Sequence, residues 1–200
     1  YIRAIRWASD RIVKSGIIGF VTNAGFLEAN TTDGLRKCLA EEFSNIYVFH
    51  LRGNQRTSGE RSRQEGGKIF GSGSRAPIAI SLLVKNPDSK ETGQIYWHDI
   101  GDYLTQKEKL ERVKEFQSIA GITDLNAWTK ITPDKHHDWV NQRDDSFDEF
   151  IKIGDKKGCD LTLFALYSRG LETGRDAWTY NFSSHSLISD IKKTIAVYDS

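Results

Sequence analysis

Apolar residues recur at two different spacings in the first quarter of the chain. Ile2, Ile5 and Ile12 lie on one helical face of residues 1–14, so we expect an amphipathic helix there. A continuous apolar run at 17–22 follows Gly16 and predicts a strand that is buried on both faces. Such a strand is typical of a parallel sheet.

A second helix and a second strand follow. Residues 31–33 (Thr-Thr-Asp) can cap a helix, and apolar residues recur at helical spacing across 35–43. The apolar run 46–51 predicts the next strand. Strand, helix and strand within about 35 residues form one right-handed crossover unit.

Residues 77–85 are rich in Ile, Leu and Val and predict a long strand. This third strand is expected to share a sheet with the first two and to run antiparallel to them, because residues 52–76, which lead to it, show no clear helix. We expect residues 95–100 to pair with it as an antiparallel hairpin, because the polar residues 86–93 are too few for a helical crossover. Residues 107–120 predict a charged amphipathic helix that ends at Gly121. Its inward face is expected to hold Leu110, Val113, Phe116 or Gln117, and Ala120.

Beyond residue 121 the texture of the sequence changes to short apolar runs between polar stretches. We therefore expect two parts, residues 1–121 and residues 122–200. The fold class predicted for the first part is α/β, with a sheet that ends in an antiparallel hairpin.

Composition narrows the class of protein. Of the 200 residues, 38% are hydrophobic and 28% charged, which excludes a disordered or collagen-like chain. No apolar run reaches the roughly 18 residues that cross a bilayer, so no membrane partner is expected. Only Cys38 and Cys159 occur, which suggests packing residues in a reducing, cytoplasmic setting. The chain starts at Tyr1 and contains no methionine, so we expect a piece of a longer protein.

Charge is distributed unevenly along the chain. Residues 1–85 hold 13 Lys and Arg against 7 Asp and Glu, whereas residues 86–200 hold 15 against 20. The excess is concentrated in residues 52–75, here called the basic loop, which are also rich in Gly and Ser. Guanidinium groups and exposed glycine amides suit phosphate contacts, which predicts a polyanionic partner such as nucleic acid. A solvated surface loop is the alternative interpretation.

Three other patterns are weaker signs of a functional site. The triplet 136–138 (His-His-Asp) lacks a third ligand at helical spacing, so we expect a polar turn and no metal site. Asp134, Asp155 and Lys157 match the loose pattern of a metal-dependent nuclease, although such residues normally lie on paired strands. The segment 71–74 (Gly-Ser-Gly-Ser) precedes a strand, whereas nucleotide-binding loops follow one, so no nucleotide site is predicted there.

Six segments of the chain form a recognisable set of motifs. They are GFVTN (19–23), LRKCL (35–39), NIYVFHLRGN (45–54), KIFGSGSRAPIAI (68–80), FALYSRG (164–170) and RDAWTYNF (175–182). Together they resemble the later motifs of adenine-specific DNA methyltransferases of the gamma motif order. The match is closest to the methyltransferase region of single-chain type ISP restriction-modification enzymes, and it is most specific at 52–77 and 167–182.

The resemblance implies a Rossmann-like methyltransferase fold of which this chain is the C-terminal part, followed by the start of a target recognition region. The loop that binds S-adenosylmethionine and the Asn-Pro-Pro-aromatic tetrapeptide lie upstream of Tyr1 in such enzymes, and no Asn-Pro-Pro occurs here. The chain alone is therefore expected to lack cofactor and catalysis. Phe70 corresponds to an aromatic residue that stacks on the extruded adenine. A loop anchor in the core is the alternative role for Phe70.

The predicted partners are double-stranded DNA and other domains of the parent polypeptide. A metal-dependent nuclease and a noncatalytic DNA-binding module remain as alternatives. The candidates for contacts with the DNA backbone are Arg52, Asn54, Arg56, Arg61, Arg63 and Arg75. The candidates for shaping the junction with the recognition region are Tyr167, Arg169, Arg175 and Trp178.

Overall fold

The computed structural model of the chain contains two compact units, Tyr1–Asp144 and Asp145–Ser200. It describes residues 1–71, 74–155, 158, 161–166, 168, 174 and 176–199. Each unit is treated by itself below.

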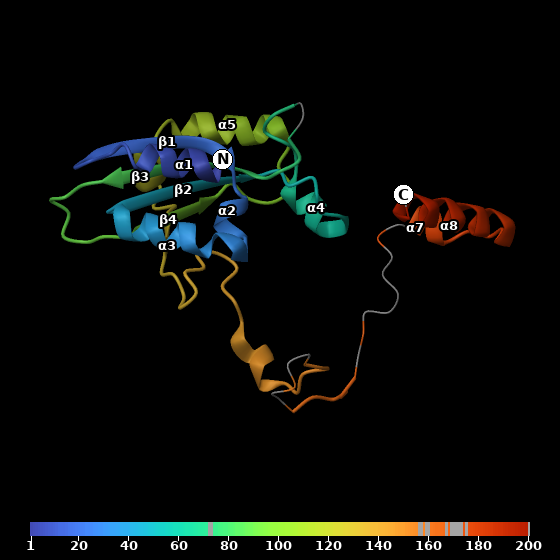
Figure 1. Cartoon of the computed structure of the whole chain (residues 1–200). Helices are drawn as coiled ribbons and strands as arrows, with labels where there is room; N and C mark the ends of the chain where they lie inside the picture. Colours follow the sequence, from blue (N-terminus) through green and yellow to red (C-terminus); the bar gives the residue numbers. More distant parts are fainter. Residues whose placement is uncertain are drawn as a thin grey trace. The chain divides into compact units, whose positions relative to one another are not determined.

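The first unit is built on a five-stranded mixed sheet (Figure 1). Its strands in spatial order are β1 (Gly16–Asn23), β3 (Ile78–Lys85), β2 (Asn45–Arg52), β4 (Gln94–Asp99) and β5 (Thr129–Ile131). Strand β3 is antiparallel to both of its neighbours, β1 and β2. Strand β2 pairs in parallel with β4, and β4 pairs antiparallel with β5. The expectation that the first three strands share one sheet and that the third runs in reverse is confirmed.

The predicted hairpin between β3 and β4 is wrong, because β2 lies between these strands. The chain from β3 instead passes the start of β2, where the Gly93 N–H donates to the carbonyl of Phe43 over 2.9 Å. Gly93 adopts φ +71°, and a Cβ there would lie 2.8 Å from the carbonyl oxygen of Ala40. A short polar connection therefore crosses one strand without a helix, because glycine allows the backbones to approach closely.

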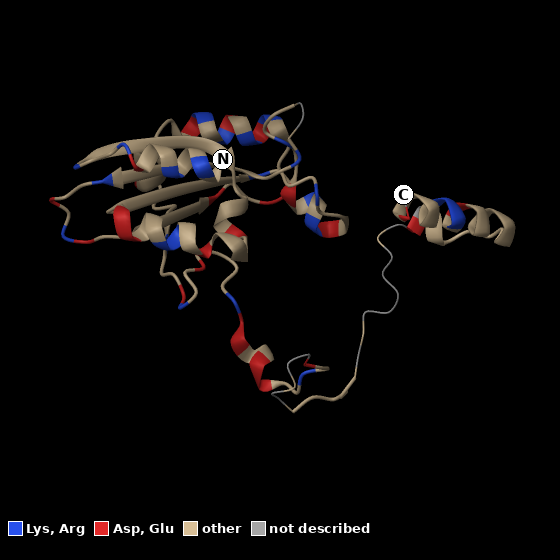
Figure 2. Ribbon diagram, in the orientation of Figure 1, with Lys and Arg blue, Asp and Glu red and all other residues tan. Residues whose placement is uncertain are grey.

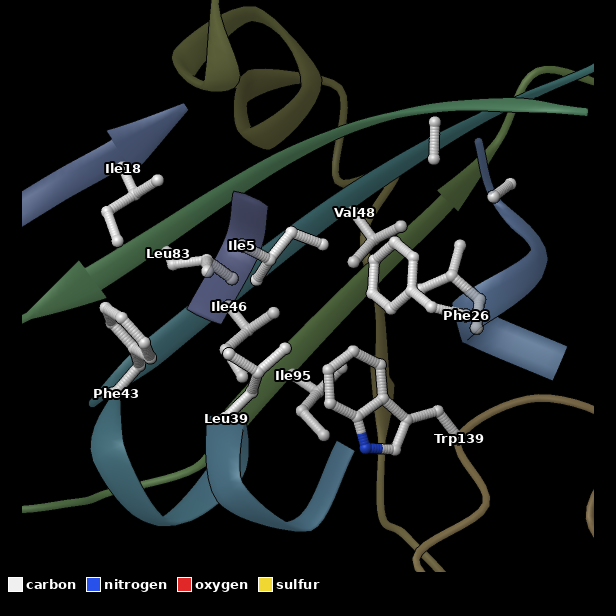
Figure 3. Packing of buried hydrophobic residues seen from close by; sticks show 13 residues of the cluster. Ile5, Ile18, Phe26, Leu39, Phe43, Ile46, Val48, Leu83, Ile95 and Trp139 are labelled. Atoms are coloured by element: carbon white, nitrogen blue, oxygen red, sulfur yellow. The ribbon is translucent and has the colours of Figure 1, made fainter. Parts of the chain in front are cut away.

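One face of the sheet packs against α1 (Ile2–Ser9), α2 (Gly25–Glu28) and α3 (Asp33–Glu42). Figure 3 shows Ile5 of α1 and Leu39 of α3 meeting Ile46 and Val48 of β2. The predicted second helix is thus confirmed, whereas the first ends earlier than residue 14. Cys38 is exposed, so its predicted packing role is wrong.

The other face packs against α5 (Gln106–Phe116) and α6 (Ile119–Asp124). The helix predicted over 107–120 is therefore two helices, separated where Gln117 adopts φ +57°. Gly121 lies inside α6 instead of ending the helix. Val113 and Phe116 pack against the core as predicted. Leu110 and Ala120 are exposed instead, and Lys109 is fully buried.

Strand β1 is an edge strand among the described residues, and only part of it is buried. Ile18 packs into the core, whereas Ile17 and Val21 on the opposite face are exposed. The prediction of a strand buried on both faces is therefore wrong for this chain.

A buried guanidinium group joins the helices on the first face to a distant loop. Arg36 of α3 is fully buried and pairs with the buried carboxylate of Asp138. Its other N–H groups donate to the carbonyl oxygens of Phe26, Ala29 and His137 at 2.8–3.0 Å and to the hydroxyl of Thr32 at 2.9 Å. The Arg36 side chain therefore joins α2, the residues that follow it and the loop at 137–138 through charge-assisted hydrogen bonds.

The first compact unit continues beyond residue 121 to Asp144. Strand β5 pairs with β4, and Trp139 packs edge-on against Phe26 in the core. The division at residue 121 into a methyltransferase part and a recognition region stays a prediction about function.

The second unit contains η2 (Asp145–Glu149), α7 (Asp176–Thr179) and α8 (Ser184–Tyr198) among its described residues. Helices α7 and α8 contact each other. A search of the described part of the chain finds no helix that combines the length and apolar character needed to span a membrane.

We predict that Arg36→Met lowers the free energy of unfolding by about 3–5 kcal/mol, because the buried Asp138 carboxylate loses the guanidinium group on its Oδ1 and keeps Arg143 on its Oδ2. Urea unfolding followed by circular dichroism measures this change. Lys37→Met is the matched control, since Lys37 is exposed and its pair with Glu41 is a surface pair at 3.9 Å. Equal stability of the two variants would contradict the role given to Arg36.

Candidate nucleic-acid interface

The carboxyl ends of β1 and β2 lie at the same edge of the sheet. Both strands are antiparallel to β3, which lies between them, so they run in the same direction. The basic loop leaves β2 and returns to β3 at this edge. Ligands of open α/β sheets bind at the carboxyl ends of parallel strands, which makes this edge the first place to look for a site.

A hollow of about 460 Å³ opens between these strand ends. Its lining includes Asn23, the last residue of β1, and Pro77, directly before β3. Asn54 and Arg56, which come after β2, also line it. Tyr1 closes another side. Amide, guanidinium and phenol groups around one hollow of this size suit a planar polar ligand such as a nucleobase.

The basic loop contains a helix that the sequence did not predict, α4 (Gly59–Glu65). It lies beyond the carboxyl end of β2 and carries charges of both signs (Figures 1 and 2). None of its residues is buried. An exposed short helix of this kind presents side chains to a partner more than to the core.

The predicted contact residues differ in how free their charges are. Arg56 and Arg61 have no side-chain partner within the described residues. Arg63 pairs with Glu60 at 3.1 Å on the surface, and Arg75 donates to the carbonyl of Gln55 at 3.0 Å. Arg56 and Arg61 are therefore the most available cations of the basic loop.

Arg52 is committed to the protein itself. Its Nε donates to Asp99 Oδ1 at 2.7 Å, and its Nη1 pairs with Asp102. The residue adopts φ +55°, a left-handed conformation that is rare for arginine, directly after a register shift in β2. This arrangement suits an anchor of the loop base better than a phosphate contact.

Asn54 is likewise tied to the loop. Its N–H donates to Glu65 Oε2 at 2.9 Å, while its side-chain oxygen accepts from the Arg56 N–H at 3.0 Å. The side chain lines the hollow at the same time. Asn54 therefore shapes the first turn of the basic loop.

A polar cluster lies beside Arg52 at the ends of β2 and β4. The Nδ1 of His50 is 3.3 Å from Asp99 Oδ2, and the imidazole stacks on Trp97 with ring centroids 5.1 Å apart. Burial by itself raises the pKa of Asp99. Hydrogen bonds from His50, from the Gly101 N–H and from Arg52 outweigh burial and lower that pKa to about 2.

Phe70 and its neighbour Ile69 have opposite environments. Ile69 is 8% exposed and belongs to the core beneath α5, whereas Phe70 is 50% exposed. Ile69 therefore anchors this end of the loop, and the Phe70 ring remains accessible to a partner.

The residues of the nuclease pattern are spread over both units. Asp134 lies in the first unit, where its Oδ1 accepts from the N–H groups of His136 and Asp138 at 2.9 and 2.8 Å. This hydrogen bonding forms the polar turn predicted for 136–138. Asp155 lies in the second unit, and Lys157 lies outside the described residues. The described residues contain no cluster of three or more His, Cys, Asp or Glu that could hold a metal ion.

The junction candidates are described only in part. Tyr167, Arg169 and Arg175 lie outside the described residues, as do Cys159 and the 72–73 pair of the Gly-Ser segment. Trp178 lies on α7, is half exposed, and lines a hollow with Thr194 and Val197 of α8. Its predicted role at the junction stays a prediction.

We predict that acid unfolding is sensitive to Asp99. Because its pKa falls from 3.8 in the unfolded chain to about 2 in the folded chain, its contribution to stability is complete above pH 3.8 and is lost as the pH falls toward 2. In this pH range, the slope of the unfolding free energy against pH should be smaller in Asp99→Asn than in the wild type. The difference corresponds to the uptake of up to about one proton on unfolding. Urea unfolding at a series of pH values measures this slope. Asp88→Asn on an exposed turn removes the same charge and should keep the wild-type slope.

Solved structures provide the comparison with known proteins. No protein-family profile matches the chain, and no relative was found among the curated proteins. The chain is similar to the ATP-dependent Type ISP restriction-modification enzyme LlaBIII bound to DNA, with 43% identity and a TM-score of 0.84. That match covers 99% of this chain and 13% of LlaBIII.

Two further structures agree. A nuclease-deletion mutant of the Type ISP enzyme LlaGI in complex with a DNA substrate mimic has 46% identity and a TM-score of 0.81, covering 96% of this chain and 18% of that one. The DrdV–DNA complex has 32% identity and a TM-score of 0.78, covering 98% of this chain and 19% of that one. The chain thus spans less than a fifth of each of these proteins. Over nearly all of its length, it is similar in sequence and in fold to a region of Type ISP restriction-modification enzymes.

Proposed function

We propose that this chain is the DNA-facing C-terminal part of an adenine methyltransferase domain in a Type ISP restriction-modification enzyme. The observation that carries the proposal is the identity of 43–46% over 96–99% of the chain to two such enzymes, each solved with DNA or a DNA mimic. The proposed reaction moves a methyl group from S-adenosylmethionine to the exocyclic amine of adenine. The intact polypeptide is the proposed catalyst.

The arrangement of the sheet supports this proposal. The sheet has two parallel strands with a reversed strand between them, β1-β3-β2, in agreement with the reversed third strand that the sequence pattern predicts. The basic loop and the 460 Å³ hollow both lie at the carboxyl edge of this group. Chemistry and DNA would therefore meet at one edge of the sheet.

The residues of this chain have binding and orienting roles in the proposal. Arg56 and Arg61 contact backbone phosphates, and Phe70 stacks on an adenine that has left the duplex. An extruded base loses its stacked neighbours, and an accessible aromatic face replaces part of that stacking. S-adenosylmethionine supplies the methyl group, and we assign none of its contacts to this chain.

A noncatalytic DNA-binding module is the alternative that the exposed cations also favour. Such a module would bind DNA but would give no methylation in any context. Methyl transfer by the complete polypeptide that contains this region separates the two functions. Absence of methyl transfer, with duplex binding intact, would contradict the proposed chemistry.

Removing the free cations should weaken DNA binding without sequence preference. We predict that Arg56→Ala and Arg61→Ala each reduce the slope of log K against log salt by about one unit, because each phosphate contact releases about one counterion. Fluorescence anisotropy with a labelled duplex at several salt concentrations measures the slope. Lys90→Ala is the control, since Lys90 is exposed on the turn between β3 and β4 at the opposite end of the sheet. An unchanged slope in both arginine variants would mean that the loop is merely solvated.

Phe70 should matter for methylation and little for stability. We predict that Phe70→Ala lowers the rate of methyl transfer by the complete polypeptide, because roughly 1–3 kcal/mol of base stacking is lost. Phe70→Trp should retain most of the methyl-transfer activity. A mismatched target adenine is easier to extrude and should partly restore the alanine variant.

Ile69→Ala provides the matched control for Phe70→Ala. It should cost about 2–5 kcal/mol of stability, because Ile69 is in the core. Thermal unfolding measures both variants. A large loss of stability in Phe70→Ala, with equal loss of methylation on both duplexes, would contradict the stacking role.

A further inference from the structure

Lys109 of α5 is a fully buried cation, and none of the described carboxylates is bonded to it. Its Nζ donates to two backbone carbonyl oxygens, that of Glu65 at 2.7 Å and that of Gly67 at 2.9 Å. Both carbonyls belong to the basic loop, where α4 ends and the chain turns toward Phe70. A lysine from a helix on the sheet face therefore binds the loop at its turning point.

The same carbonyl group links the two sides of the loop. The Glu65 oxygen also accepts from the Gly53 N–H at 3.1 Å, and the Glu65 carboxylate accepts from the Asn54 N–H at 2.9 Å. The segment that leaves β2 (residues 53–54) and the segment that ends α4 (residues 65–67) thus meet at Glu65, the residue that Lys109 binds. Loss of the ammonium group would loosen both segments of the loop together.

Neighbouring contacts fix the loop to the residue two before α5 and to the first residue of α5. The Gly67 N–H donates to the Leu104 carbonyl at 2.9 Å, and Gln106 Nε2 donates to the Ile69 carbonyl at 2.7 Å. A Cβ on Gly66, at φ +65°, would lie 2.2 Å from the Leu104 oxygen. Two successive glycines therefore allow the backbones to touch, and the contacts end directly before Phe70.

Burying an ammonium group is costly, and the cost is visible here. Burial lowers the pKa of Lys109 to about 8, helped by Arg52, while Glu65 and Asp99 oppose this shift. A buried apolar side chain at this position of α5 would avoid the cost. The lysine is explained by the two hydrogen bonds that its ammonium group donates to loop carbonyl groups, which an apolar side chain would not make.

We propose that Lys109 is a positioning residue that holds the basic loop in its binding conformation before the ligand arrives. The inference rests on the proposed function, because the loop carries the candidate DNA contacts and Phe70. A loop ordered in advance does not lose conformational entropy on binding, so affinity is gained without any contact between Lys109 and DNA. Helix α5 thereby sets the position of a binding loop on the adjoining edge of the sheet.

Amide hydrogen exchange of the 200-residue chain tests the inference, with Lys109→Met compared against Lys107→Met. Lys107 lies on the same helix but is exposed, and its pair with Glu111 spans 3.9 Å. In Lys109→Met, exchange in residues 59–71 should accelerate by roughly tenfold or more, while β2 and β3 exchange as before. Affinity for a duplex should fall by roughly threefold or more. Lys107→Met should change neither quantity.

Lys109→Gln provides a second variant in case the methionine variant unfolds. The glutamine amide retains a donor, so its exchange and affinity should be intermediate. Unchanged loop exchange in both Lys109 variants would overturn the inference, as would equal acceleration over the loop and the sheet. Faster loop exchange with unchanged duplex affinity would also overturn it, provided that Arg56→Ala and Arg61→Ala still weaken binding. If those arginine variants also leave binding unchanged, the proposed function has failed. Faster loop exchange in the Lys109 variants would still show that Lys109 orders the loop.

Discussion

The buried guanidinium of Arg36 is the interaction on which the first unit depends. It connects α3 to Asp138, about a hundred residues later, and also to the carbonyl groups of Phe26 in α2 and of Ala29 directly after α2. These segments flank the hollow at the carboxyl edge, since Glu28, Ala29 and Thr32 are part of its wall. A buried ion pair contributes little net free energy when both charges are present, but losing one partner is costly. Arg36 therefore fixes the geometry of the site wall more than it raises the overall stability.

Two cations thus order the two sides of the same edge. Arg36 holds the segments after β1, and Arg52, by pairing with Asp99 and Asp102, holds the end of β2 against β4. Both arginines satisfy groups within the protein. Among the described residues of the basic loop, Arg56 and Arg61 are the cations whose side chains have no partner, and these side chains are exposed. Pairing within the protein accordingly distinguishes the structural arginines from those available to a partner. The number of charges in a stretch of sequence does not reveal which arginines are paired in this way.

Local periodicity predicted the strands well, and long-range pairing poorly. The runs at 17–22, 46–51 and 77–85 became β1, β2 and β3, including the reversal of β3, because apolar strand runs and a helical crossover are local signals. The partner of β4 could not be predicted this way. It depends on Gly93 letting the connection pass close to Ala40, a contact between segments more than fifty residues apart in the chain. The burial of both faces of β1 was overestimated because an apolar run does not state which neighbours cover it.

The candidate site shows the same limit at the level of single side chains. The basic loop was recognisable from its composition, yet the sequence assigned Leu110 to the interior and left Lys109 outside. Hydrophobicity ranks leucine above lysine for burial, and this ranking fails here because the buried ammonium group donates to two loop carbonyls. The signal that could have located Lys109 is the pair Gly66-Gly67, since consecutive glycines within a charged loop indicate close backbone approach. An exposed polar loop has few apolar side chains with which to anchor itself in the core. A buried donor such as Lys109 can hold it instead, by hydrogen bonds to the loop backbone.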